Sequence, residues 1–233
     1  MVHSRDMNKL EDFKIVRPYT LTAADVNAIH LASPGVNDKD DWAKPELDGM
    51  KERLREYLRE QQNGRCAYCR LKLHENVATS EIEHIVPKSK KPQWMYEPFN
   101  LCLSCKLCNS IKGYRKKILE NRADSASTLP RSSSDYKLIH PYLDIYSEHI
   151  ELVDGVLYRG KTKKGKYTIW LCGLDRYQVA AERADVLISR NVNNYVRIML
   201  LISNPDNAQY VKNIDVLKER IERMIEEYME EMA

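Results

Sequence analysis

Two closely spaced cysteine pairs constrain this chain more than any other feature of its sequence. Cys66 and Cys69 form one Cys-x2-Cys pair, and Cys105 and Cys108 form a second. Four thiolates in two such pairs match the ligand set of a tetrahedral structural Zn²⁺ site. The alternatives are buried apolar cysteines or disulfides, but no signal-peptide pattern is evident and disulfides need an oxidising compartment. The sequence therefore predicts a zinc ion that joins the two ends of an inserted segment.

A further cysteine offers a competing ligand, because Cys102 and Cys105 are also two residues apart. The positions of Asn100 and Asn109 favour Cys105 and Cys108 as the second pair. We therefore expect Cys102 to lie on a short helical turn as an ordinary buried thiol.

The segment of about residues 64 to 116 resembles the HNH endonucleases, which have a ββα-metal fold. The resemblance rests on an acidic-histidine doublet, a central asparagine, the second cysteine pair with an asparagine after it, and a lysine-glycine doublet. In this sequence these are Glu83-His84-Ile85-Val86-Pro87, Asn100, Cys105-Lys106-Leu107-Cys108-Asn109 and Lys112-Gly113.

The resemblance implies a role for each polar residue. His84 would be the general base that activates a water molecule, a role that a neutral imidazole can fill near pH 7. Glu83 and Asn109 would hold one divalent ion, Mg²⁺ or Mn²⁺, because oxygen ligands suit such ions. The Asn100 amide would hydrogen-bond the backbone after the first strand and so orient His84. An isolated Glu-His pair would be only a solvated strand end.

Basic residues gather on either side of this motif, although the net charge of +3 is small. One cluster accompanies Trp94 in a loop, and the other follows Asn109 on a predicted helix over residues 110–122. We expect both clusters to contact phosphate groups. Their members are Lys88, Lys90 and Lys91 in the loop, and Lys112, Arg115 and Lys116 on the helix.

By contrast, we expect the basic face of the helix over 45–62 to be solvated, with intrahelical ion pairs. Its members are Lys51, Arg53, Arg55 and Arg59.

Periodicity and turn signals predict the other elements. Thr20 or Thr22 can cap a helix through AADVNAIHLA, a second helix covers residues 45–62, and a hairpin within 69–83 turns near Glu75-Asn76. A later hairpin turns at Asp154-Gly155. After it we expect a short helix from Thr168, a break at Gly173 and one long helix. A last helix begins near Pro205; its apolar stripe is Ile214, Leu217, Ile221, Met224 and Tyr228, which we expect to pack on the preceding helix.

These elements define an α+β protein that is mainly helical, with the zinc-stapled ββα unit at its centre. The expected domains are a helical segment at 1–63, the nuclease unit at 64–120, a Ser-rich linker at 121–135, and a mainly helical domain with a small hairpin at 136–233. The longest apolar stretch is too short and polar to span a bilayer, so we expect a cytoplasmic protein without a membrane partner.

The order of motifs along the whole chain also resembles the HNH subunits of Septu-type bacterial anti-phage systems. That resemblance implies a partner ATPase of the ABC or SMC-like class and a nucleic-acid target, with DNA favoured over RNA. Two alternatives stay open from the residues: a zinc-stabilised DNA-binding module that does not cut, and a stand-alone restriction or homing nuclease. The complete set of Glu83, His84, Asn100 and Asn109 favours cleavage, because binding alone needs no positioned base.

Overall fold

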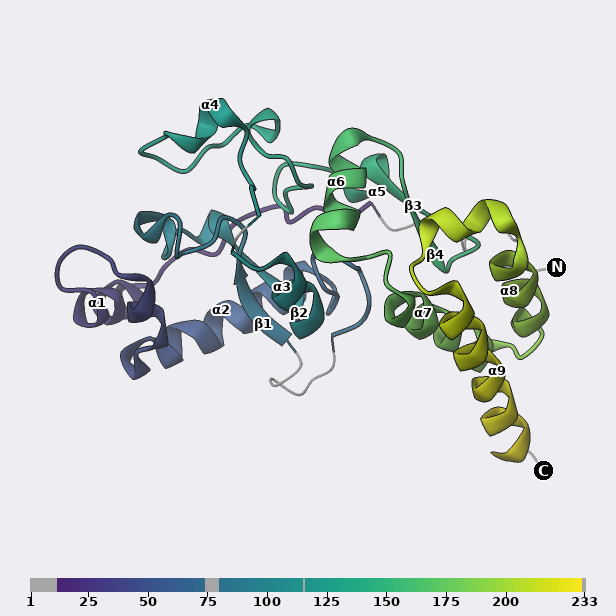
Figure 1. The fold of residues 1–233 in the computed structure, drawn as a ribbon. Helices are drawn as coiled ribbons and strands as arrows, with labels where there is room; N and C mark the ends of the chain where they lie inside the picture. Colours follow the sequence, from purple (N-terminus) through teal and green to yellow (C-terminus); the bar gives the residue numbers. More distant parts are fainter. Residues whose placement is uncertain (1–11, 74–79, 115, 232–233) are drawn as a thin grey trace. The chain divides into compact units, whose positions relative to one another are not determined.

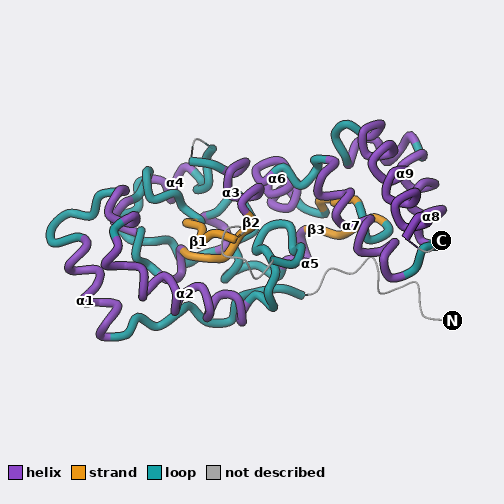
Figure 2. Tube along the Cα trace, turned by 90° about the horizontal axis from the view of Figure 1, so that it is seen from below, coloured by secondary structure: helices purple, strands orange, loops and turns teal. Residues whose placement is uncertain are grey.

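The computed structural model describes residues 12–73, 80–114 and 116–231. These residues form two compact units, one spanning Phe13–Tyr146 and one that runs from Ser147 onward. Each unit contains a single two-stranded antiparallel sheet, and helices and loops make up the rest (Figures 1 and 2). The predicted class, mixed with a majority of helix, is therefore confirmed.

The first unit begins with the two predicted helices, α1 (Ala23–Ala32) and α2 (Asp48–Gln61). Thr22 caps α1: its hydroxyl accepts a hydrogen bond from the backbone N–H of Asp25, whose carboxylate accepts one from the backbone N–H of Thr22. Two 3₁₀ turns, Lys39–Ala43 and Pro45–Leu47, lead into α2. The apolar face of α2 is buried through Met50, Leu54 and Leu58, as its spacing of three and four residues predicts.

The sheet of this unit pairs β1 (Ser80–His84) with β2 (Leu101–Cys105), in a register that sets Glu83 opposite Cys102 and His84 opposite Leu101. Helix α3 (Lys106–Lys112) begins directly after β2 and lies beside both strands (Figure 1). Residues 85–100 therefore separate the two strands in the sequence. The candidate site residues lie on both sides of this segment.

Three local predictions need correction here. Cys102 lies in β2 and not on a helical turn. The helix expected over 110–122 is α3, which ends at Lys112 because Gly113 follows with a φ of +55°. The strand expected to pair with β1 from within 69–83 is not the one observed, since β1 pairs with β2; the turn predicted near Glu75-Asn76 lies outside the described residues.

The structure also differs from the predicted linker at 121–135. Helix α4 (Asn121–Asp124) forms inside it, and Leu129 is buried. Tyr136, just after it, pairs with Leu119 across an isolated bridge and is buried as well. The Ser-rich composition hides these few apolar anchors, and the two units divide after Tyr146 instead.

The second unit begins with a short helix and the predicted hairpin. Helix α5 (Tyr146–His149) leads into β3 (Ile150–Val153), which pairs with β4 (Leu157–Gly160). The turn residues Asp154 and Gly155 both have positive φ, +49° and +78°, as a tight hairpin requires.

Four helices complete this unit: α6 (Lys163–Cys172), α7 (Tyr177–Arg190), α8 (Asn194–Ser203) and α9 (Ile214–Glu231). Gly173 ends α6 in the left-handed conformation, where the break was predicted. The single long helix predicted after it is divided into α7 and α8 by Asn191-Val192-Asn193, whose asparagines favour turns.

The last helix starts later than predicted, because residues 205–210 form a 3₁₀ turn. Its stripe packs in the core of this unit with side chains of α7 and α8, as expected, and Leu217, Ile221 and Met224 are buried there.

Among the described residues, no helix combines the length and apolarity that crossing a bilayer demands.

Candidate metal centre and active site

The four predicted cysteines come together in the first unit. Cys66 and Cys69 lie in the turn after α2, Cys105 ends β2, and Cys108 lies in the first turn of α3. Their Sγ atoms all lie within 4.8 Å of one another, and those of Cys69 and Cys105 are 3.9 Å apart. A tetrahedron of thiolates about 2.3 Å from a zinc ion has edges of about 3.8 Å. The spacing therefore fits a metal held by four sulfurs.

Cys102, the competing ligand, is excluded by the alternation of the strand. It is fully buried, and its Sγ lies 3.9 Å from the hydroxyl of Tyr68. Successive side chains of a strand point to opposite faces. The choice of Cys105 and Cys108 over Cys102 agrees with the sequence prediction.

His84 lies at the end of β1 with its imidazole fixed on two sides. The ring of Trp42, from the 3₁₀ turn before α2, meets it edge to face, with centroids 4.6 Å apart. Its Nε2 lies 3.1 Å from the carbonyl oxygen of Met95. Because a carbonyl only accepts, Nε2 carries the proton and Nδ1 keeps a lone pair. Burial disfavours the imidazolium and lowers the pKa of His84 to about 3, so the ring is neutral at pH 7.

Asn100 holds the backbone around His84 in place, as expected. Its Oδ1 accepts a hydrogen bond from the N–H of Val86 at 2.8 Å, and its Nδ2 donates to the carbonyls of Val86 and Trp94 at 3.0 and 3.2 Å. Val86 follows His84 closely in the chain, and Trp94 precedes the acceptor Met95. One buried amide therefore fixes both the strand end that bears His84 and the carbonyl that His84 contacts.

Glu83 points to the other face of β1, toward α3. Its carboxylate forms an ion pair with the ammonium group of Lys112, which also donates to the carbonyl of His84 at 3.1 Å. Burial raises the pKa of Glu83, and Lys112 offsets part of that rise. The side chain of Lys112 is only 1% exposed, so the phosphate contact predicted for it is replaced by an internal ion pair.

Asn109, predicted to share a divalent ion with Glu83, has its amide hydrogen-bonded to another carboxylate of β1. Its Nδ2 donates to Oε2 of Glu81 at 2.6 Å. Sequence reasoning missed Glu81, although strand alternation in Ser-Glu-Ile-Glu-His already sets Glu81 and Glu83 on the same face. Two carboxylates and one amide thus lie along this side of the site.

A groove of about 640 Å³ is lined by these groups at the end of β1. Glu81, Glu83 and His84 line it, with Asn109 and Lys112 from α3. The rest of its lining comes from elements on either side of β1 and α3: Trp42, Lys51, Arg55, Ser80, Ile82, Pro87, Lys88, Ser89, Gly113 and Tyr114. Of the described acidic, histidine and cysteine donors, only the four cysteines form a group of three or more close enough to share a metal ion.

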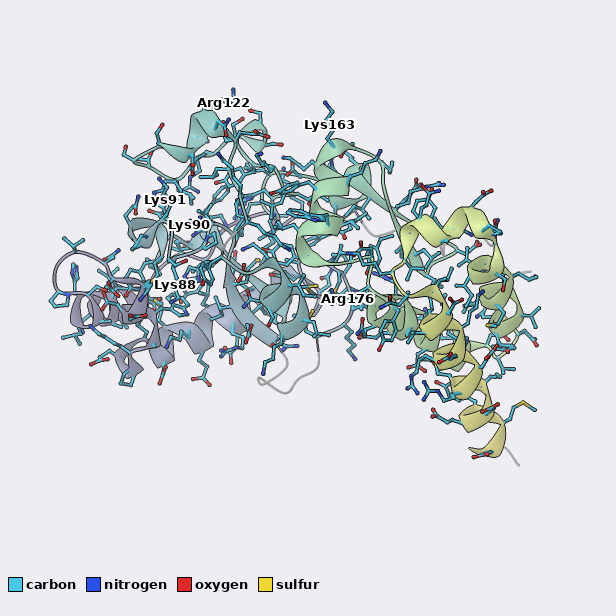
Figure 3. The ribbon with its side chains drawn as sticks, in the orientation of Figure 1. Lys88, Lys90, Lys91, Arg122, Lys163 and Arg176 are labelled. Carbon is cyan, nitrogen blue, oxygen red and sulfur yellow. The ribbon has the colours of Figure 1, made fainter. Side chains whose placement is uncertain are left out.

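The predicted basic loop reaches the groove through one of its three lysines. Lys88 lines it, whereas Lys91 donates to the carbonyl of Asp124 and lies over the Trp94 ring, 5.0 Å from its centroid. Lys90 is exposed outside the groove lining. The three lysines lie along the same loop in Figure 3. On the helix side, Lys116 donates to the carbonyl of Ile111, and Arg115 lies outside the described residues.

Comparison with known proteins agrees with the motif reading. Residues 66–115 match the family model described as HNH endonuclease, which is the segment that the motifs marked out. The match covers the two cysteine pairs, β1, β2 and α3.

Two curated relatives extend the similarity beyond this segment. Septu protein PtuB of Bacillus thuringiensis is 31% identical over 128 residues, which are 55% of this chain and 40% of that protein. Septu protein PtuB of Bacillus mycoides (strain KBAB4) is 30% identical over 152 residues, 58% of this chain and 51% of that protein. The chain thus spans about half the length of the curated relatives it matches.

Proposed function

We propose that this protein is a metal-dependent endonuclease that hydrolyses phosphodiester bonds of nucleic acid, DNA in preference to RNA, in the groove at the end of β1. The observation that carries the proposal is the state of His84: a neutral imidazole, fixed by Trp42 and Met95, with a free Nδ1 lone pair beside a carboxylate-lined groove. The match of residues 66–115 to HNH endonucleases supports the same chemistry.

In this proposal His84 is the general base. Its Nδ1 takes a proton from the water molecule that attacks the phosphorus atom, and its low pKa keeps that lone pair available throughout the neutral range. Asn100 has a positioning role, because it holds the backbone of Val86 and Trp94 and touches no reacting atom. The buried contacts of His84 leave its ring one orientation.

Glu83 and Asn109 would hold the divalent ion, Mg²⁺ or Mn²⁺, with Glu81 as a third oxygen donor at the same face. The donor set fits, since these side chains offer the carboxylate and amide oxygens that such ions take, with water completing the shell. When bound, the ion supplies positive charge to the scissile phosphate and the leaving oxygen. The chain's own part is to keep Glu83 oriented, which the ion pair with the Lys112 ammonium does.

The four-cysteine site would hold a structural zinc ion. All four positions are filled by protein sulfur, and three of the four cysteines are buried, which leaves no open position for a substrate. The ion would join the turn after α2 to the β2–α3 junction. It would thereby fix the frame from which Asn109 and Lys112 extend.

We further propose that the protein is the nuclease effector of a bacterial anti-phage system, acting in the cytoplasm with a partner ATPase of the ABC or SMC-like class. The similarity to two Septu PtuB proteins supports this. The small net charge of +3 gives little long-range attraction to nucleic acid, which a partner could supply. Co-purification of an ATPase from a native host would support it; full activity of a strictly monomeric protein alone would count against it.

A substrate panel tests the nuclease proposal directly. Purified protein is incubated with plasmid, linear duplex, single-stranded DNA and tRNA, each with Mg²⁺, Mn²⁺ or EDTA. We expect cleavage with either metal, none in EDTA, and recovery when excess Mg²⁺ is returned. Binding without cleavage under every condition would instead favour a DNA-binding module.

A further inference from the structure

The groove lining includes basic residues as well as carboxylates, and some of the basic residues lie outside the segment that matches the HNH family. Lys51 and Arg55 line the groove from α2, and Lys88 lines it from the loop after β1. Residues four apart on a helix lie on the same face, so Lys51 and Arg55 present their charges together. The two α2 residues precede the matched residues 66–115.

Arg55 differs from its basic neighbours in having no internal partner. Its Nε is buried without a hydrogen bond, and no hydrogen bond or ion pair links its guanidinium to the part of the chain that the structure describes. By contrast, Arg53 binds the Asp25 carboxylate at 2.5 Å, and Arg59 donates to the carbonyl of Leu73 at 3.2 Å. Lys51 pairs with Asp48 at 3.0 Å. The intrahelical ion pairs expected for this face are therefore missing at Arg55.

A buried donor without an acceptor costs about 1–3 kcal/mol, and native proteins contain few of them. Because Arg55 lines the groove, its guanidinium is within reach of a ligand there that brings oxygen acceptors. The guanidinium presents a planar set of donors that matches two oxygens of a phosphate group. The carboxylates of Glu81 and Glu83 in the same lining would repel a phosphate, so a phosphate held in this groove needs a nearby cation.

We infer that Arg55 is a phosphate-binding residue of this site, one that grips the nucleic-acid backbone from α2 while the chemistry takes place at β1 and α3. The inference rests on the proposed nuclease function. Contacts of this kind carry no sequence information; they set where the backbone lies in the groove. Arg55 would thus place the scissile phosphate toward His84.

The test uses the full chain and a short fluorescein-labelled DNA duplex. Binding is measured by fluorescence anisotropy at several salt concentrations, with Mg²⁺ and in a His84→Ala background so that the duplex stays intact. The variants are Arg55→Ala, Arg55→Gln, which keeps most of the side-chain stem, and Arg17→Ala. Arg17 is the matched control, because it is an exposed arginine of the same unit that does not line the groove. Single-turnover cleavage is then measured for the same three variants in protein that keeps His84.

Both Arg55 variants should bind about 10-fold more weakly, with a salt slope shallower by about one unit, whereas Arg17→Ala should match the parent. Cleavage by either Arg55 variant should fall by about 10²-fold, the usual loss when one preorganised donor is removed from a reacting phosphate or oxyanion. Zinc content should stay at the parent value, and the thermal midpoint should not fall, because each Arg55 substitution removes an unsatisfied buried donor.

Binding and cleavage by both Arg55 variants equal to those of Arg17→Ala would overturn the inference, as would equal weakening in all three. If Arg55→Ala fails to fold, Arg55→Gln decides alone. Failure of the nuclease proposal has a different signature, because then wild-type protein does not cleave DNA, or the His84→Ala protein cleaves it at the wild-type rate.

Discussion

At the scale of single residues, the site depends on buried polar groups that have partners and one that does not. Asn100 uses both its oxygen and its amide hydrogens on backbone groups, and His84 uses Nε2 on Met95. Glu83 and Lys112 form an ion pair in the lining of the groove. Each of these bonds fixes a group that the chemistry needs. Arg55 is the exception: its Nε is buried without a hydrogen bond, and the residue lines the groove.

The cysteine set gives a prediction at this scale. Cys108→Ser should lose the metal and unfold the first unit, because zinc binding contributes on the order of 10 kcal/mol to folding of such sites. Cys102→Ser is the matched control: it removes a buried thiol from the same strand region but no ligand, so the zinc should remain. Metal analysis and thermal unfolding distinguish the two. Zinc lost from the Cys102 variant and kept by the Cys108 variant would reverse the assignment.

How far the sequence predicts this site depends on the range of the interaction. Cys66, Cys69, Cys105 and Cys108 were predictable because spacing alone encodes a ligand set. Glu81 was predictable in principle from strand alternation. Arg55 was not, because the sequence around it offers glutamates as intrahelical partners, and only the packing of α2 against the groove shows that it pairs with none of them.

At the scale of elements, local signals were reliable and long-range pairing was not. The Thr22 cap, the Asp154-Gly155 turn and the stop at Gly173 depend on a few adjacent residues, and all three are observed. Strand β2 has only five residues, and its pairing with β1 depends on a loop closure that no local pattern encodes. The division into α7 and α8 at Asn191-Val192-Asn193 is a local signal that the sequence analysis missed.

The contact between α1 and α2 gives a prediction with a defined pH dependence. Asp25 is fully buried; burial opposes its charge, but hydrogen bonds from Arg53, Thr22 and Tyr19 outweigh it and lower its pKa to about 2. The usual value for aspartate in an unfolded chain is about 3.9. The folded state therefore gains about 2–3 kcal/mol from ionised Asp25 above pH 4, and loses that gain as the pH falls toward 2.

Asp25→Asn should accordingly lower the free energy of unfolding by about 2–3 kcal/mol in urea at both pH 7 and pH 5. Asp48→Asn, which removes an exposed partner of Lys51, should leave it nearly unchanged. A deficit for Asp25→Asn that differs between pH 7 and pH 5, or that equals the deficit of Asp48→Asn, would contradict the assigned role.

At the scale of the whole molecule, each unit has its own core. One core cluster gathers Leu47, Met50 and Met95 from the first unit, and another gathers Leu217, Ile221 and Met224 with side chains of α7 and α8 from the second. The cysteine site lies entirely in the first unit. We therefore propose that the two units are domains that unfold separately.

Removal of the zinc with a strong chelator should then unfold the first unit and leave the second unit folded. Hydrogen exchange followed by mass spectrometry should show loss of amide protection in α2, β2 and α3, with protection retained in α7 and α9. Protein kept in excess zinc is the control. Simultaneous loss of protection in both units would show that they fold as one cooperative body.

The most direct test of the nuclease account is the single-turnover cleavage rate of the His84→Ala protein. His30→Ala serves as the matched control, because His30 is an exposed histidine on α1 that does not line the groove. Loss of a general base lowers a rate by about 10² to 10⁴. We predict a loss of this size for His84→Ala, with zinc content and DNA binding unchanged, and a wild-type rate for His30→Ala. Cleavage by His84→Ala at the wild-type rate would contradict the account.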